Sequence, residues 1–185
     1  MQTIEQRLDQ VRALLGNSDF LSGKGLSNEV NIRIFPYDPK DEMAVRHFTE
    51  QITTDTSLPC RIICRNLFEV FLEICEDMDI LDEIPNMEDE NGSAWLLDEI
   101  HQDIDTNEFV DKIDYPDHER GDVVLLTGVG EVFPFMRIHV LLEAIQPRFA
   151  GIPILVLYPG DYDGHQVKLF GKLPPNDYYR AFSIV

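Results

Sequence analysis

Two aspartates have the residue type and the position to bind a cation. Asp38 follows an alternating apolar segment and Asp161 follows a continuous one, so both carboxylates are expected where strands end. Hard cations such as Mg²⁺ prefer carboxylate oxygens. Aspartate in Pro-Tyr-Asp-Pro and Pro-Gly-Asp more often forms a turn or caps a helix, however, and two acids make an incomplete ligand set. The sequence therefore assigns no metal site.

A turn that could approach phosphate follows another apolar run. Thr127-Gly128-Val129-Gly130 begins like the dinucleotide-binding pattern G-x-G-x-x-G, but Phe133 stands at the third glycine position and Glu131 would repel phosphate. A tight turn that needs two unusual backbone angles is the favoured interpretation. The sequence contains no G-x-x-x-x-G-K-[ST], which excludes a conventional P-loop NTPase.

Arg137 and His139 fall in the first turns of a helix expected from residue 134 to 146. Arg137 could hold an anion and His139 could transfer a proton. A structural histidine that donates to a carbonyl, and an arginine paired with an acid, are the favoured alternatives. The other histidines show neither His-x-x-x-His nor His-Glu-x-x-His, the spacings that bind zinc, and the sequence contains no Gly-x-Ser-x-Gly of a serine hydrolase. The sequence assigns no catalytic residue and no cofactor, and it favours a non-enzymatic role without deciding it.

The elements that must position these groups alternate along the chain. Apolar runs predict strands and apolar residues three or four apart predict helices. The predicted strands cover residues 30–34, 60–64, 122–126, 152–158, 167–170 and 181–185, and the predicted helices cover 1–16, 39–54, 67–81 and 134–146. This order predicts an α/β fold of three layers, a mostly parallel sheet with helices on both faces, Rossmann-like without a P-loop. We expect one domain over residues 1–185, with an N-terminal helix at 1–16 and an acidic helical insertion at 66–111.

Ligands of open α/β sheets bind outside the carboxyl ends of the strands. That rule brings the chemistry-bearing groups to one predicted edge of the sheet. The candidate ligand-binding residues are Asp38, Thr127, Gly128, Gly130, Arg137, His139 and Asp161.

The charge of the chain excludes several classes of partner. It has 34 acidic and 15 basic residues, a formal net charge of −19. Such a chain repels nucleic-acid phosphates and anionic membranes, and no apolar run approaches the roughly 20 residues of a spanning helix. The N-terminal segment does not resemble a signal peptide, so we expect a cytoplasmic protein. The three cysteines have no Cys-x-x-Cys spacing and are expected as reduced thiols in apolar surroundings.

Acidic residues are concentrated in one segment. Residues 66–111 contain sixteen Asp and Glu and no Lys or Arg. A charge run is usually a solvated face, but a field of one sign can also dock a basic partner. The candidate interface residues are Glu88, Asp89 and Glu90 in this segment and the aromatic anchors Tyr178 and Tyr179 near the C-terminus. Whether residues 82–93 are ordered, and the oligomeric state, are left open.

Several motifs occur together in an order that resembles the BrxB family. They are Phe35-Pro36-Tyr37-Asp38-Pro39, Leu126-Thr127-Gly128-Val129-Gly130, Pro134-Phe135-Met136-Arg137-Ile138-His139, Leu169-Phe170-Gly171-Lys172-Leu173 and Tyr179-Arg180-Ala181-Phe182. The resemblance covers nearly the whole chain. It implies a small cytoplasmic accessory protein of a BREX bacteriophage-defence system. Such a protein acts beside a methyltransferase, an ATPase and the alkaline-phosphatase-like protein PglZ, with no established enzymatic activity and no assigned residue roles.

Three functions follow as hypotheses. The first is a non-catalytic adaptor that binds other BREX proteins, with PglZ as a candidate partner. The second is a divergent nucleotide- or metal-dependent enzyme that uses the strand ends. The third is an acidic mimic of nucleic acid that occupies a DNA-binding surface on a partner.

Overall fold

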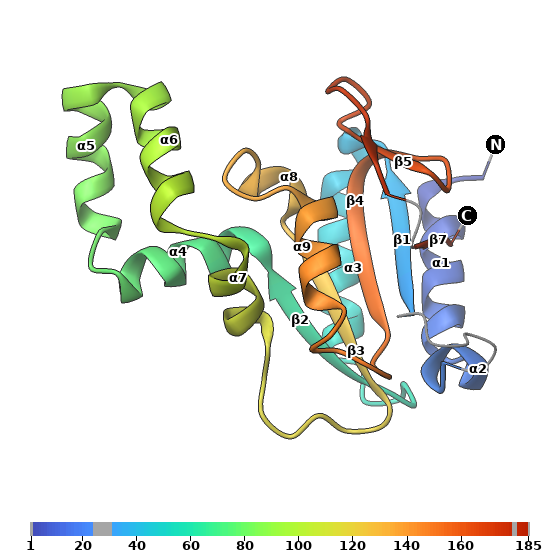
Figure 1. Ribbon diagram of the computed structural model, residues 1–185. Coiled ribbons are helices and arrows are strands. Elements are labelled where there is room, and N and C mark those ends of the chain that lie inside the picture. Colours follow the sequence, from blue (N-terminus) through green and yellow to red (C-terminus); the bar gives the residue numbers. More distant parts are fainter. Residues whose placement is uncertain (1, 24–30, 179–180, 185) are drawn as a thin grey trace.

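The computed structural model describes residues 2–23, 31–178 and 181–184 (Figure 1). The elements are, in chain order, α1 (Ile4–Leu15), α2 (Ser18–Leu21), β1 (Ile32–Tyr37), η1 (Pro39–Asp41), α3 (Glu42–Thr53), β2 (Arg61–Asn66), α4 (Leu67–Asp77), η2 (Leu81–Glu83), α5 (Ile84–Asn91), α6 (Ser93–Asp103), α7 (Thr106–Ile113), β3 (Asp122–Thr127), α8 (Val129–Val132), α9 (Ile138–Ile145), β4 (Ile154–Tyr162), β5 (Gln166–Leu169), β6 (Asn176–Asp177) and β7 (Phe182–Ser183). In the described residues, no helix is both long enough and apolar enough to cross a membrane.

The predicted fold class is confirmed. Five strands form a parallel path in the order β2-β3-β4-β1-β7, and β5 and β6 add antiparallel pairs beyond the end of β4. The register places Ile154 of β4 opposite both Ile32 of β1 and Val124 of β3. β1, the first strand in the chain, therefore lies inside the sheet between β4 and β7, which come much later in the sequence.

Helices cover both faces of the sheet. Successive residues of a strand point to opposite faces, so Ile34 packs in one apolar core and Phe35 in the other. Helices α4, α6, α7 and α9 contribute to the first core, and α1 and α3 contribute to the second. Burial on both sides explains why β3 and β4 are continuous apolar runs in the sequence.

The helix predicted from residue 134 to 146 is wrong at its start. Helix α8 begins directly after Gly128, the chain is extended at Phe133, and α9 begins only at Ile138. Proline disfavours the helical conformation at the residue before it, which explains why the helix is interrupted at Phe133, before Pro134. Arg137 is consequently the residue that precedes α9, and His139 is its second residue.

The strand predicted at 152–158 also ends later than expected. β4 continues through Pro159 and Gly160 to Tyr162, where its last residues pair antiparallel with β5. Gly160 permits this because a Cβ there would lie 2.3 Å from the carbonyl oxygen of Lys168. Asp161 is therefore a strand residue of a hairpin, not a residue of the loop after the strand.

Residues 81–103, named here the acidic arm, comprise η2, α5 and α6. Figure 1 shows α5 and α6 extending away from the sheet. Leu96 and Ile100 anchor α6 in the core, whereas α5 has no buried residue. Residues 82–93 thus form η2, α5 and the start of α6.

Candidate functional site

The predicted ligand-binding residues lie around the carboxyl end of the sheet, but they do not share one pocket. β1 and β4 are neighbours, whereas β3 lies on the far side of β4 beside β2. Between these strand ends, α8 and the β4–β5 hairpin separate the surface into hollows. Asp38 and Asp161 line one hollow, Thr127 and Gly128 line a second, Arg137 and His139 line a third, and Gly130 lines none of the three.

The hollow of Asp38 and Asp161, the Asp38 hollow, measures about 430 Å³. Asp38 pairs with Lys40 Nζ at 2.8 Å and accepts a hydrogen bond from the Lys40 amide at 3.1 Å, and both contacts lower its pKa. The Asp38 carboxylate thereby caps η1. Within the described ranges, no group of three or more His, Cys, Asp or Glu side chains could hold a metal ion. A ligand-binding role for this pair stays a prediction.

The hollow of Thr127 and Gly128, the Thr127 hollow, measures about 280 Å³ and is anionic. Its one lining cation, Arg46, pairs with Glu131 and lies 2.8 Å from Glu42, and these contacts raise the Arg46 pKa. This arrangement opposes a phosphate ligand, because one guanidinium faces four carboxylates. Those carboxylates belong to Glu42, Glu50, Glu69 and Glu131.

Both glycines of the Thr127-Gly130 turn have structural reasons to be glycine. Gly128 has φ +70°, and a Cβ there would lie 2.2 Å from Asn66 Oδ1, which accepts hydrogen bonds from the first turn of α4. Gly130 is helical, and a Cβ there would lie 2.8 Å from the ring of Phe170. Only Gly128 has the unusual backbone angle that the sequence suggested for both.

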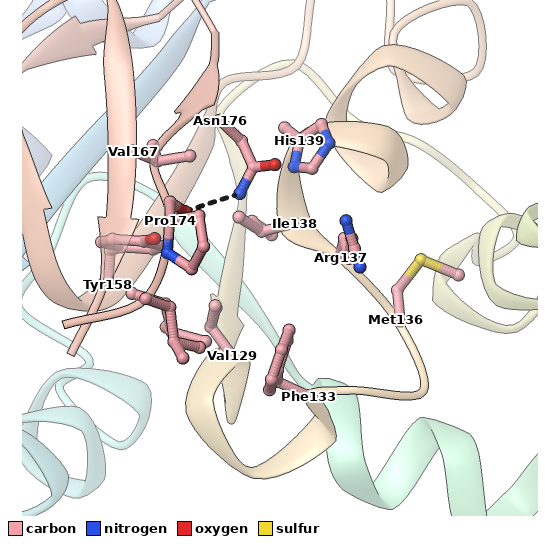
Figure 2. A pocket seen from close by; sticks show the side chains of 12 residues that line it. Val129, Phe133, Met136, Arg137, Ile138, His139, Tyr158, Val167, Pro174 and Asn176 are labelled. Atoms are coloured by element: carbon pink, nitrogen blue, oxygen red, sulfur yellow. Dashed lines mark hydrogen bonds between the residues drawn. The ribbon is translucent and has the colours of Figure 1, made fainter. Parts of the chain in front are cut away.

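The third hollow, the α9 cavity, lies between α8, the start of α9 and the β4–β5 hairpin and measures about 110 Å³ (Figure 2). Burial, and secondly the charge of Arg137, lower the pKa of His139, so its imidazole is neutral at pH 7. The polar side chains Arg137, His139, Tyr158 and Asn176 line the cavity beside apolar groups.

The sequence did not identify two of these polar residues. Tyr158 was visible only as the last residue of an apolar strand, although a tyrosine that closes such a run carries a polar tip on an apolar body. Asn176 gave no signal, since its neighbours in the cavity come from distant parts of the chain.

The predicted interface residues differ in their exposure to solvent. Glu88, Asp89 and Glu90 are exposed on α5 of the acidic arm. Tyr178 is 1 % exposed and lies in the core, so this side chain does not present itself to a partner. Tyr179 lies outside the described residues.

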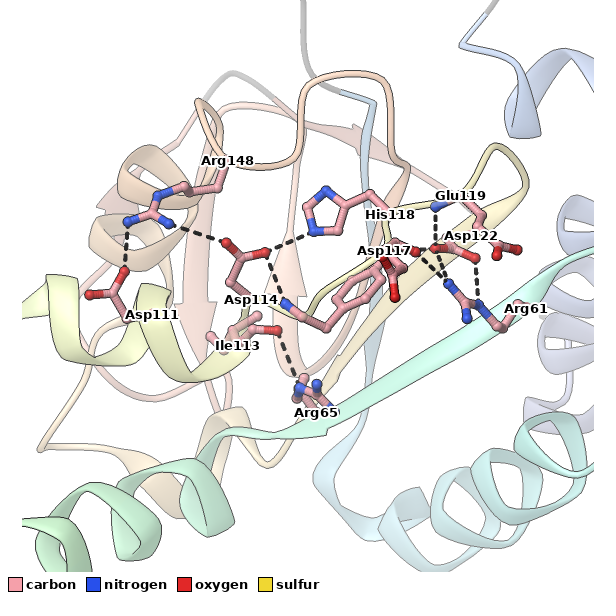
Figure 3. Close-up of polar contacts among 11 residues, drawn as sticks. Arg61, Arg65, Asp111, Ile113, Asp114, Asp117, His118, Glu119, Asp122 and Arg148 are labelled. Atoms are coloured by element: carbon pink, nitrogen blue, oxygen red, sulfur yellow. Dashed lines mark hydrogen bonds and ion pairs between the residues drawn. The ribbon is translucent and has the colours of Figure 1, made fainter.

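A polar network that the sequence did not predict joins the opposite, amino-terminal end of the sheet (Figure 3). Asp122, 1 % exposed at the start of β3, accepts hydrogen bonds from Arg61 of β2. Arg148 pairs with Asp111 and Asp114 and so connects the end of α7 to the segment after α9. These contacts fix the connections between elements and are remote from the three hollows.

Comparison with known proteins identifies the family. The chain matches the family described as "BREX protein BrxB" over residues 63–184. A "BREX protein BrxB" of Bacillus cereus (strain H3081.97) is 35 % identical over 192 aligned positions, which cover 100 % of this chain and 99 % of the relative. The chain belongs to the BrxB family. A second BrxB protein, from Escherichia coli O9:H4 (strain HS), is 27 % identical over 98 % of this chain and 92 % of its own length.

BrxB membership confirms the resemblance found in the motifs. It places the chain among the proteins of BREX systems and implies a role in defence against bacteriophage. No solved structure matches the chain.

Proposed function

We propose that the chain is a non-catalytic adaptor of a BREX complex and that its acidic arm binds a basic surface of another BREX protein. The observation that carries the proposal is the unneutralised charge of a projecting element. Eight acids occupy residues 81–103 without a Lys or Arg in that segment. Among the described residues, none of these eight takes part in an ion pair.

The charge of the arm suits recognition. Elsewhere, basic side chains neutralise nearby acids, as Lys112 does for Asp77 and Arg148 does for Asp111. A projecting field of one sign raises the rate of encounter with an oppositely charged partner and disfavours others.

The arm also carries an apolar anchor. Trp95, the only tryptophan of the chain, is 39 % exposed on α6. Tryptophan is enriched among the residues that dominate binding energy at protein interfaces. We infer that Trp95 supplies contact area and that the acids supply orientation.

The partner is expected to be a cytoplasmic BREX protein, and PglZ is the candidate to test first. A divergent enzyme has less support, because the residues proposed for it divide among three hollows and the Thr127 hollow repels phosphate. Nucleotides with Mg²⁺ at millimolar concentration should therefore leave the melting temperature unchanged, since a ligand that binds the native state raises it.

The test is co-purification of the full chain from a host that expresses the whole defence operon. The arm variant Glu88→Gln/Asp89→Asn/Glu90→Gln keeps side-chain shape and changes the net charge from −19 to −16. The control variant Asp9→Asn/Glu50→Gln/Glu143→Gln makes the same change at exposed acids elsewhere. We expect the arm variant to retain less BREX protein than the control variant. This difference between the variants should shrink as the salt concentration rises, because salt screens the charges of the arm.

Trp95→Ala should lower retention as well, without changing the salt dependence. Equal losses of bound BREX protein in the arm and control variants would show that only net charge matters, which would contradict the proposal. Failure of the wild type to retain any BREX protein at any salt concentration would contradict it too. Adding DNA to the captured complex examines the mimicry hypothesis. If DNA releases the partner from the wild type, the acids occupy a nucleic-acid-binding surface of that partner.

A further inference from the structure

We propose that the α9 cavity binds a small organic carboxylate, with its apolar group inside the cavity and its carboxylate at the start of α9 beside Arg137. This site is separate from the acidic arm, so it does not depend on the adaptor proposal.

The walls and the volume of the cavity define the apolar part of the ligand. Eight apolar side chains line it: Val129, Phe133, Met136, Ile138, Val167, Leu169, Leu173 and Pro174. The cavity measures about 110 Å³. An apolar protein cavity of about 150 Å³ holds one benzene molecule. The site therefore accepts a branched aliphatic group or at most one ring, and it is too small for a nucleotide.

The start of α9 supplies donors for an anion. Arg137 precedes the helix, and no side chain caps it. Within the described residues, the amides of Ile138 and His139, the first two of the helix, have no hydrogen-bond acceptor. Free amides at a helix N-terminus attract negative charge because the backbone dipoles align there.

The Arg137 guanidinium is also available to a ligand. Its side chain is exposed at the cavity and forms no ion pair or hydrogen bond within the described ranges. In contrast, Arg12, Arg46, Arg61 and Arg148 are each paired with an acid. A planar guanidinium matches the two oxygens of a carboxylate. One such charge in a chain of net charge −19 suits a monoanion better than a phosphate dianion.

Tyr158 supplies a further polar group on the cavity wall. The residue is 2 % exposed and lines the cavity, and in the described part of the chain its hydroxyl has no hydrogen-bond partner. In the described residues, the buried side-chain polar atoms without a partner are Asn31 Oδ1 and Arg33 Nη1, so the Tyr158 hydroxyl is open to the cavity, where a ligand can reach it. Burial raises the pKa of Tyr158, so its hydroxyl stays protonated and can donate to an oxygen.

Figure 2 shows how these groups surround one space. Tyr158 lies on one side and Arg137 on the other, with His139 and Asn176 along a third side and Val129 and Phe133 opposite them. A ligand between them would place its carboxylate toward Arg137 and its carbon atoms against the apolar walls.

Two sources share this chemistry. A free carboxylic acid has a compact apolar group next to a carboxylate, and so does the last residue of a protein chain that ends in Leu or Phe. The test must therefore compare free acids with peptides.

The first experiment titrates the full chain with 3-methylbutanoate and with phenylacetate, up to about 10 mM, while NMR follows the methyl signals of Val129, Ile138 and Leu169. Probes of this size are expected to bind with dissociation constants of about millimolar. Phenylacetamide has the same shape without the charge and should bind at least about tenfold more weakly.

Variants locate the binding site. Arg137→Gln should weaken binding of phenylacetate at least about tenfold, because it removes a charge-assisted contact. Arg120→Gln makes the same change of charge at an exposed arginine outside the cavity and should leave binding unchanged. Tyr158→Phe keeps the apolar ring and removes a hydroxyl that lies across the cavity from Arg137, so it should weaken binding less than Arg137→Gln does while the methyl spectrum remains that of a folded protein.

The second experiment compares a short peptide ending in Leu or Phe with its C-terminal amide. Tighter binding of the free-carboxylate peptide than of phenylacetate would identify a protein terminus as the ligand, and binding of the small acids alone would identify a free acid. The proposal is overturned if no probe gives saturable shifts at the cavity methyls. Equal binding of acid and amide, or full binding by Arg137→Gln, would overturn it too.

Discussion

The carboxylate of Asp122 should be a main determinant of stability. It accepts hydrogen bonds from Arg61 Nε and Nη2 at 2.8 Å each, from the Tyr115 hydroxyl at 2.8 Å and from the Glu119 amide at 2.9 Å. The Arg61 contacts, then the Glu119 amide and the Tyr115 hydroxyl, lower the Asp122 pKa to about 2. The perturbation we propose is Asp122→Asn, which keeps the shape and removes the charge.

The size of the effect follows from these contacts. Lowering the pKa from 3.8 to about 2 corresponds to about 2 kcal/mol of folding free energy. The amide NH₂ of Asn would also face groups that now donate to Asp122, and a buried donor without an acceptor costs about 1–3 kcal/mol. We therefore expect Asp122→Asn to lower the free energy of unfolding by about 3 kcal/mol at pH 7.

The direction of the pH dependence is fixed by the sign of the shift. A carboxyl group whose pKa is lower in the folded state contributes its full stability above its unfolded pKa of 3.8, and it loses that contribution as pH falls toward 2. About half of the charge contribution should be lost by roughly pH 3. The difference between wild type and Asp122→Asn should therefore shrink by about 1 kcal/mol between pH 7 and pH 3.

Urea denaturation at the two pH values measures both quantities. Asp98→Asn is the control, because Asp98 is exposed on α6 and its side chain forms no ion pair within the described residues. It should change stability by no more than about 0.5 kcal/mol. Equal stability of the two variants, or a gap that widens as the pH falls, would refute the reasoning.

Three further outcomes are expected. Gly128→Ala should cost about 2 kcal/mol or more in urea denaturation, because the new Cβ would lie 2.2 Å from Asn66 Oδ1. Gly164→Ala, where φ is also positive and no atom lies within 4 Å, should cost only the backbone strain of about 1 kcal/mol, and equal costs would contradict the clash. Phe71→Ala should lower the free energy of unfolding by about 3–5 kcal/mol, since this ring of α4 is buried in the apolar core. A drop in melting temperature of only a few degrees would argue against this. The Cys75 thiol should resist iodoacetamide at pH 8 until the chain unfolds, because burial raises its pKa to about 11; rapid labelling of the folded chain would contradict its burial.

The strand-end residues illustrate why local patterns predict elements better than sites. The alternation of Ile32 and Ile34 and the apolar run of β3 reflect burial of each strand, which neighbouring residues alone reveal. The distance between Asp38 and Thr127 depends instead on the strand order, in which β4 separates β1 from β3. The sequence rule therefore found the correct edge of the sheet and could not find its division into hollows.

The two boundary errors have different origins. Continuing β4 through Gly160 to Tyr162 requires a partner strand, and β5 is that partner. A hairpin pairing stabilises residues that local composition marks as a turn. The late start of α9 has a local cause, because proline disfavours the helical conformation at the residue before it and Phe133 precedes Pro134.

The sequence by itself determined the family, the alternation of strands and helices and the concentration of acids at residues 66–111, because motifs, periodicity and charge are properties of the chain in order. Only the tertiary structure decided that the acids of residues 81–103 project on an arm, that Tyr178 is buried, and that Arg137 and Tyr158 line one cavity. These facts depend on which distant segments pack together. Packing minimises the exposed apolar surface of the whole chain, and no single segment contains that information.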